Sequence, residues 1–145
     1  MTQNFIAETR ITIHAPAEAI WRALTDPALV KQYMYGTKLE TDWKVGSPIT
    51  WKGEWEGKPY EDKGTVLAVE PRKLLKVTHW SPMGGSEDKP ENYHTVTYTL
   101  HGEDGTTKLT LTQDNNATKE EAEQMANDNW GPVLQGLKET VEKSV

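Results

Sequence analysis

Four polar side chains interrupt segments that otherwise read as apolar on one side of a strand. They are His79, His94, Tyr98 and Gln113. Histidine and tyrosine can donate or accept hydrogen bonds and move protons, and a glutamine amide both donates and accepts. Because a buried polar group without a partner costs about 1–3 kcal/mol, we expect these side chains to bond one another, to hold water, or to orient a ligand. Mutual bonding is the favoured interpretation.

Catalysis by these residues has little support in the sequence. A histidine base needs a nucleophile and an orienting carboxylate, and no Asp or Glu shares the predicted inner faces with His79 and His94. Two isolated histidines lack the third ligand and the spacing of a zinc site, and the chain has no cysteine and no Gly-rich phosphate loop. We therefore predict no catalytic residue, no metal and no cofactor, and an enzyme is disfavoured.

Large aromatic side chains are the second feature that could bind a molecule. The chain has six tryptophans and five tyrosines, and several of them are expected at one open end of a sheet. Apolar pockets with a few polar groups are where small ligands bind. Core or rim packing is the simpler interpretation for any one of these residues, whereas their convergence favours a site. The candidate ligand-binding residues are Tyr35, Trp51, Trp55, His79, Trp80, His94, Tyr98, Gln113, Met125 and Trp130.

The elements that would hold these residues follow from hydrophobic spacing and turn residues. A strand is predicted over 5–13, and two short helices follow, one with Pro16 in its first turn and one with Asp26 as cap and Pro27 as first residue. Six strands of a meander are then predicted at 37–43, 47–55, 59–69, 73–80, 92–102 and 106–113. Alternation assigns the following to the inner face: Ile49, Trp51, Trp55, Leu75, Val77, His79, His94, Val96, Tyr98, Leu100, Leu109, Leu111 and Gln113.

The C-terminal segment has the clearest helical pattern. Thr118 and Glu121 form a capping box, after which apolar residues recur at helical spacing. Pro132 lacks the N–H that would bond the carbonyl of Asp128, so a bend is expected there. The side chains expected to be buried against the sheet are Met125, Trp130, Val133, Leu134, Leu137 and Val141. The residues thus predict an α+β chain that ends in one long helix.

Composition and length narrow the classes of protein further. A chain of 145 residues has the usual size of one domain, so we expect a single domain over 1–145. A formal charge of -6 without a Lys/Arg run argues against nucleic-acid binding. The sequence shows neither a secretory leader nor 18 consecutive apolar residues, so we expect no membrane span and a cytoplasmic location. A monomer is expected.

Three local signatures carry a family resemblance: IHAPAEAIWRALTDP at 13–27, GTVLAVEP at 64–71 and NWGPVLQGLK at 129–138. With the order of elements, they resemble the activator of heat-shock-protein-90 ATPase homologue-like family of the START-like (SRPBCC) superfamily, which also holds polyketide cyclases and pollen allergens. The motifs are structural. The resemblance implies a helix-grip fold, in which a curved antiparallel sheet of about seven strands wraps around the long C-terminal helix and leaves a hydrophobic space between them.

The resemblance leaves the function open, because members of the family bind varied apolar or aromatic ligands or assist a chaperone, and a fold alone does not choose among roles. The chain lacks the extra N-terminal domain of the eukaryotic co-chaperones, which disfavours the chaperone role. We therefore predict a cavity that binds a small apolar or aromatic molecule of the lipid, polyketide or polyphenol class. Two alternatives remain. A partner-binding module would need an exposed apolar or strongly charged sheet face, and a polyketide cyclase or hydrolase-like enzyme would need a carboxylate inside the cavity.

Overall fold

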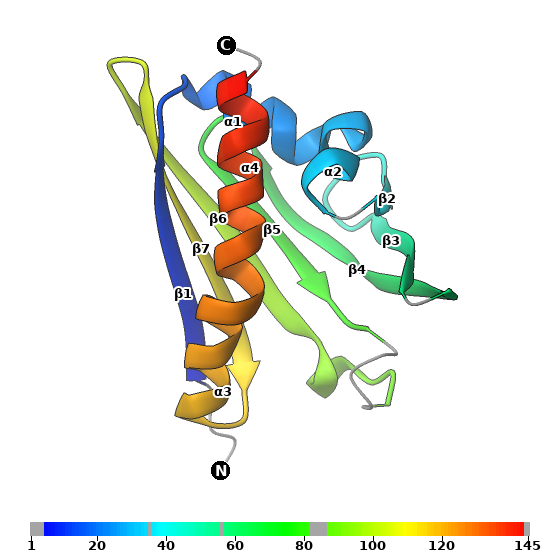
Figure 1. The fold of residues 1–145 in the computed structure, drawn as a ribbon. Coiled ribbons are helices and arrows are strands. Elements are labelled where there is room, and N and C mark those ends of the chain that lie inside the picture. The colour runs from blue at the N-terminus through cyan, green and yellow to red at the C-terminus, as the bar shows by residue number, and fades with distance from the viewer. Residues whose placement is uncertain (1–4, 35, 56, 82–86, 144–145) are drawn as a thin grey trace.

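The sheet and the long helix define the architecture (Figure 1). The computed structural model describes residues 5–34, 36–55, 57–81 and 87–143. Within these residues, seven strands form one antiparallel sheet in the order β1-β7-β6-β5-β4-β3-β2. The strands are β1 (Phe5–Ile13), β2 (Lys38–Glu40), β3 (Pro48–Trp55), β4 (Lys58–Glu70), β5 (Leu74–His79), β6 (His94–Glu103) and β7 (Thr106–Asn116). The α+β class and the helix-grip arrangement predicted from the sequence are confirmed.

The strand boundaries differ from the prediction mainly at three ends. β2 is shorter than the predicted 37–43, and Trp43 beyond it has a positive φ of 61° that does not fit a strand. β5 stops at His79, so that Trp80 forms only an isolated bridge with Lys63. β7 continues beyond 113 to Asn116. A short 3-10 turn, η2 (Pro90–Asn92), precedes β6.

Two short helices, α1 (Ala17–Thr25) and α2 (Pro27–Tyr33), follow β1. Pro16 occupies the position just before α1 and not its first turn, and its carbonyl oxygen accepts the N–H of Ala19 at 3.0 Å. At the start of α2, the N–H of Ala28 donates to Asp26 Oδ1 at 3.0 Å, with Pro27 as the first helical residue, as predicted. Since α2 contacts both the long helix and β2, it closes the sheet at its β2 side.

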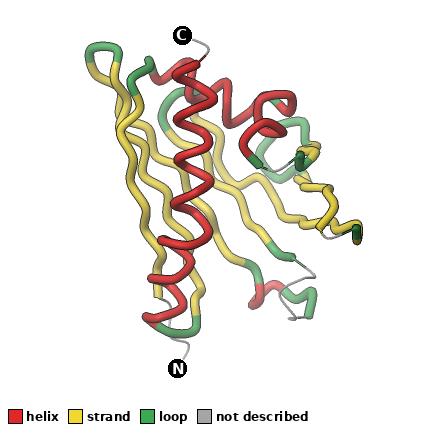
Figure 2. The backbone as a smooth tube through the Cα atoms, viewed as in Figure 1, coloured by secondary structure: helices red, strands yellow, loops and turns green. Residues whose placement is uncertain are grey.

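The long helix spans 25 residues and lies across one face of the sheet (Figures 1 and 2). It consists of α3 (Lys119–Gln124), a π-helical segment η3 (Met125–Trp130) and α4 (Gly131–Lys143). Its capping box is confirmed, because the N–H of Glu121 donates to Thr118 Oγ1 at 3.1 Å. The disturbance expected at Pro132 takes the form of the wider π turn just before it, where the N–H of Gly131 reaches back to the carbonyl of Ala126.

The core lies between this helix and the sheet. Leu134, Leu137 and Val141 are buried as predicted, and Trp130 and Val133 pack half-buried against the same cluster. Met125 belongs instead to a small separate cluster with Ala7, Ala122 and Ala126. In the described part of the chain, no helix is long and apolar enough to cross a membrane.

The predicted inner face of the sheet agrees with the register of the strands. Leu75 lies opposite Tyr98, and Val77 lies opposite Val96. Eight residues of the predicted inner face are buried, one of them polar: Ile49, Leu75, Val77, Val96, Leu100, Leu109, Leu111 and Gln113. Because strand residues alternate between faces, this agreement also determines which residues of β4 point inward.

Candidate functional site

A cavity of about 160 Å³ lies between the sheet and the beginning of α4. An engineered apolar cavity of roughly 150 Å³ holds one benzene molecule, so this space is large enough for one aromatic ring. A smaller space of about 30 Å³ adjoins it and shares four of its wall residues. The wall of the larger cavity consists of Met34, Thr37, Trp51, Tyr60, Asp62, Val77, His79, Val96, Tyr98, Trp130 and Val133.

An acidic side chain and a histidine form the polar part of the wall. Asp62 on β4 lies opposite Trp51 on β3, and its Oδ2 is 2.9 Å from Nε2 of His79 on β5. Because an ionised carboxylate only accepts hydrogen bonds, Nε2 carries the proton and donates it. The rings of Trp51 and His79 meet edge to face, with centroids 5.1 Å apart at 65°. These contacts hold the imidazole between the indole ring of Trp51 and the carboxylate of Asp62.

One oxygen of this carboxylate has no hydrogen-bond partner among the described residues. Asp62 Oδ1 is buried and accepts no hydrogen bond from any residue that the structure describes. The side chains of Asp62 and His79 are 19% and 26% exposed, so the pair stands at the cavity wall and is not sealed in the core. A buried acceptor of this kind is costly to leave unpaired.

The prediction that no carboxylate shares the inner face with His79 was wrong. On β4, alternation from the fully buried Val66 points Gly64, Asp62 and Tyr60 inward. Inner faces had been assigned to the neighbouring strands but not to this one. Counting back in steps of two from Val66 is the sequence signal that finds Asp62.

Two hydroxyl groups lie in the same wall. Thr37 Oγ1 and the hydroxyl oxygen of Tyr60 are 2.7 Å apart and bond each other. Gly53 pairs with Tyr60 across β3 and β4, and a Cβ at Gly53 would lie 2.5 Å from the Tyr60 hydroxyl oxygen. The missing side chain at Gly53 therefore gives the phenol ring the room to reach Thr37.

Tyr98 presents a hydroxyl that is not hydrogen-bonded to any described residue. Burial raises the pKa of Tyr98 well above that of a free tyrosine. Tyr33, near the adjoining space, has its pKa raised by burial and then by the nearby Tyr98, and its hydroxyl donates to the carbonyl of Ala23 at 2.8 Å. Both phenols are therefore neutral groups over the whole physiological pH range.

The favoured expectation for the four polar side chains, that they bond one another, was wrong. His79 bonds Asp62, and Nδ1 of His94 lies 2.8 Å from the carbonyl oxygen of Asp114. The Nε1–H of Trp130 donates to Oε1 of Gln113, which is only 3% exposed. Residue alternation predicts the face of the sheet on which a side chain lies. It does not predict that Asp62 and Trp130, which lie far away in the sequence, come close enough to bond these side chains.

The predicted site residues divide into three groups. Trp51, His79, Tyr98 and Trp130 line the cavity. Gln113 reaches it only through Trp130, while Trp80, His94 and Met125 lie outside its wall. Trp80 stacks on Tyr93, with centroids 6.2 Å apart, below the ammonium group of Lys63. Tyr35 and the side chain of Trp55 lie outside the part that the structure describes. Wall residues absent from the predicted set are Met34, Thr37, Tyr60, Asp62, Val77, Val96 and Val133.

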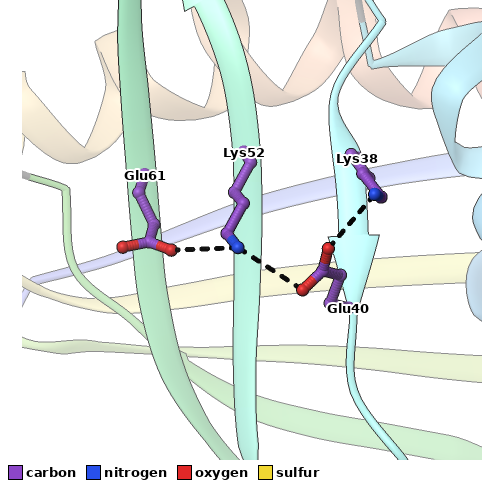
Figure 3. A network of polar contacts seen from close by, with 4 residues as sticks. All are labelled: Lys38, Glu40, Lys52 and Glu61. Carbon is purple, nitrogen blue, oxygen red and sulfur yellow. Dashed lines mark hydrogen bonds and ion pairs between the residues drawn. The ribbon is translucent and has the colours of Figure 1, made fainter.

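The opposite face of the sheet carries alternating charges (Figure 3). Lys52 lies between the carboxylates of Glu40 and Glu61, at 3.5 and 3.6 Å, and Lys38 lies 3.4 Å from Glu40. A hydrogen bond from Lys38 and the charge of Lys52 lower the pKa of Glu40. Exposed pairs like these contribute little stability. Since both signs are paired here, these four residues do not form the strongly charged face that a partner-binding module would need.

Comparisons with known proteins agree with this fold. A family model described as Activator of Hsp90 ATPase homolog 1-like protein matches residues 14–142. The solution structure of ChR145 from Cytophaga hutchinsonii is 48% identical, with 97% of this chain and 95% of that chain covered and a TM-score of 0.83. MLL2253 from Mesorhizobium loti is 25% identical, with 99% of each chain covered and a TM-score of 0.76. No curated protein matches the sequence.

A third structure shares the fold at lower identity. The Aha1 dimer from Colwellia psychrerythraea is 24% identical, with 94% of this chain and 96% of that chain covered and a TM-score of 0.70. At this identity the likeness concerns the fold alone.

Proposed function

Since the chain belongs to the family of Activator of Hsp90 ATPase homolog 1-like proteins, whose fold typically binds small hydrophobic ligands, we propose that its cavity binds a small, flat, mostly apolar molecule. The volume of about 160 Å³ fits a compound with a single aromatic ring. Among lipids, polyketides and polyphenols, this size favours a phenolic ring or a ring-sized part of a larger compound. The adjoining space of about 30 Å³ gives room for a small substituent.

The observation that carries this proposal is an open space with aromatic walls inside a packed protein. Protein interiors are close-packed, and voids larger than a water molecule are few. Here Trp51 and Tyr98 from the sheet and Trp130 from the helix border a space that their own side chains leave unfilled. Aromatic pairs in stacked or edge-on contact add about 0.5–1.5 kcal/mol each beyond burial, so a flat ring gains more here than a branched aliphatic molecule.

Toluene tests the proposal, because it is an apolar single-ring probe of suitable size. Titration followed by proton–nitrogen correlation NMR should shift the indole N–H signals of Trp51 and Trp130. A Val133→Trp variant should abolish these shifts, since Val133 is half-buried on α4 and a larger side chain there can fill the cavity. Leu67→Trp is the matched control, because Leu67 is 40% exposed and does not line the cavity.

Two results would count against ligand binding. One is the absence of any shift near the solubility limit of toluene. The other is a set of shifts that Val133→Trp leaves unchanged, because the probe would then bind elsewhere. Retained binding in Leu67→Trp shows that an added indole ring does not disturb the protein in general.

Acid–base catalysis is a second candidate, favoured by the Asp62–His79 pair. A carboxylate that orients an imidazole is what such an enzyme needs. Asp62, however, bonds Nε2, the nitrogen of His79 that lies farther from the backbone. Only Nδ1, the nitrogen nearer to Cβ, is then left to exchange a proton with a substrate. This arrangement suits binding better than proton transfer to a substrate. Incubation with phenyl acetate should therefore give the same rate of hydrolysis for the native protein and His79→Gln, and a rate lost in the variant would favour the enzyme.

A further inference from the structure

We propose that Asp62 makes the cavity selective for ligands that carry a hydrogen-bond donor, such as a phenol or an aromatic amine, and makes it reject aromatic carboxylates. This inference rests on the proposed function, since it names the class of ring that the same cavity takes. Asp62 is thereby a specificity-determining residue, and His79 is the positioning residue that holds its carboxylate in the wall.

The argument begins with the hydrogen bonds of the carboxylate. An ionised carboxylate has about four acceptor sites and no donor. Within the described residues, His79 fills one of these sites through Oδ2, at 2.9 Å, and the buried Oδ1 accepts nothing. An unpaired acceptor that carries charge is more costly to bury than a neutral one. A ligand donor at this position removes that cost.

Other polar groups of the wall do not supply this donor. The hydroxyls of Thr37 and Tyr60 bond each other at 2.7 Å, and neither of them donates to Asp62 Oδ1. Tyr98 is four residues from His94, the residue opposite His79, which corresponds to about 13 Å along the strand. The Tyr98 hydroxyl makes no hydrogen bond to Asp62 or to another described residue, so it can meet a second polar group on a ligand.

A small rotation of the Asp62 carboxylate makes one of its oxygens accessible to the ligand. Oδ1 is closed to solvent in this arrangement, but the terminal torsion of aspartate is broad and soft. The edge-to-face contact with Trp51 keeps the His79 ring in place, at a centroid distance of 5.1 Å. Rotation about Cβ–Cγ can therefore turn an oxygen toward the cavity while the imidazole still donates to the carboxylate.

Three chemical classes of ring should then behave differently. A phenol donates its O–H to Asp62. Toluene has a similar size and no donor, so it leaves the carboxylate unpaired. Benzoate brings a second negative charge next to the first, and two like charges in a space of low polarity repel strongly.

The experiment measures dissociation constants by NMR titration for phenol, toluene and benzoate, with the native protein, Asp62→Asn and Glu61→Gln. Asn keeps the shape of the side chain and an acceptor for His79, but it removes the charge. Glu61 is the neighbouring residue of the same strand, on the outer face of the sheet, so Glu61→Gln removes the same charge outside the cavity. The correlation spectrum of each variant reports whether its fold is intact.

In the native protein and in Glu61→Gln, we expect phenol to bind and benzoate not to bind. In Asp62→Asn, the preference for phenol over toluene should fall about tenfold, the equivalent of 1.4 kcal/mol, and benzoate should become a ligand. An unchanged phenol-to-toluene ratio in Asp62→Asn would overturn the inference and leave the proposed function standing. If neither neutral ring bound the native protein, the proposed function itself would fall, and this inference with it.

Discussion

The hydrogen bond between Trp130 and Gln113 should be one of the larger polar contributions to the stability of the long helix on the sheet. Trp130 ends the π-helical segment, and its Nε1–H donates to Oε1 of Gln113 on β7, a side chain that is 3% exposed. In Trp130→Phe, a ring remains but the donor is lost. The buried amide oxygen then lacks its partner, which costs about 1–3 kcal/mol.

The smaller ring adds a second loss. Trp130 is half-buried in the cluster between helix and sheet, and phenylalanine covers less apolar surface, which we estimate at about 1 kcal/mol. Trp130→Phe should therefore lower the free energy of unfolding by about 2–4 kcal/mol. Gln113→Leu should cost about 1 kcal/mol, because the half-exposed indole N–H can turn to water.

Urea unfolding followed by far-UV circular dichroism measures both variants and the double variant Trp130→Phe/Gln113→Leu. Because the double variant leaves no orphaned amide, it should be more stable than the sum of the two losses predicts, by about 1–2 kcal/mol. Losses that add to within about 0.5 kcal/mol would refute the reasoning, since they would show that the two side chains do not interact in solution.

Three further predictions concern the packing and the buried phenols. Leu137→Ala should lower the free energy of unfolding by about 2–5 kcal/mol, because Leu137 is fully buried between helix and sheet; a loss below about 1 kcal/mol in urea unfolding would contradict the helix-grip packing. Gly64→Ala should destabilise the protein severely, because the added Cβ would lie 1.7 Å from the carbonyl oxygen of Thr78. The control Gly57→Ala has open space around its Cβ and a positive φ of 80°, so it should cost only about 1 kcal/mol. Equal melting temperatures for the two variants would argue against the close approach of β4 and β5. Burial raises the pKa of Tyr98, so the phenol of Tyr98 loses its proton in the unfolded chain, above about pH 10, before it does so in the folded protein. The contribution of Tyr98 to the free energy of unfolding is therefore fully present below about pH 10 and decreases as the pH rises further. Above that pH, the urea midpoint of Tyr98→Phe should fall less steeply with pH than the midpoint of the native protein.

Local signals in the sequence predicted most of the fold. The Asp26-Pro27 start of α2 and the Thr118–Glu121 capping box are encoded within a few residues, so the structure reproduces both. The inner faces of β5 and β6 followed from alternation, because a shift by one residue would have placed Val77 and Val96 in solvent. Pro132 likewise marked the place where the long helix departs from α-helical geometry, although not its π-helical form.

The candidate site was harder to predict because its contacts join segments that are distant in the sequence. The Trp130–Gln113 bond depends on how far the helix lies along β7, which no local pattern states. Met125 shares the apolar stripe of Trp130, yet it packs near β1 in a different cluster. Asp62 was missed for a different reason, since no inner face was assigned to its strand, and only alternation from the buried Val66, four residues later, places this charged side chain on the inner face.

The energetics of Asp62 favour a functional origin for its position. Removing a polar or charged side chain from water costs free energy, and its hydrogen bonds inside the protein often only offset that cost. The Asp62–His79 pair bears an additional cost, since one carboxylate oxygen is buried without a donor in the described part of the protein. An apolar residue at this position would remove that cost and would still pack against Trp51. The hydrogen bond from His79 therefore offsets only part of the cost of placing this carboxylate in the wall, and the ligand proposed above would offset the rest by supplying the missing donor.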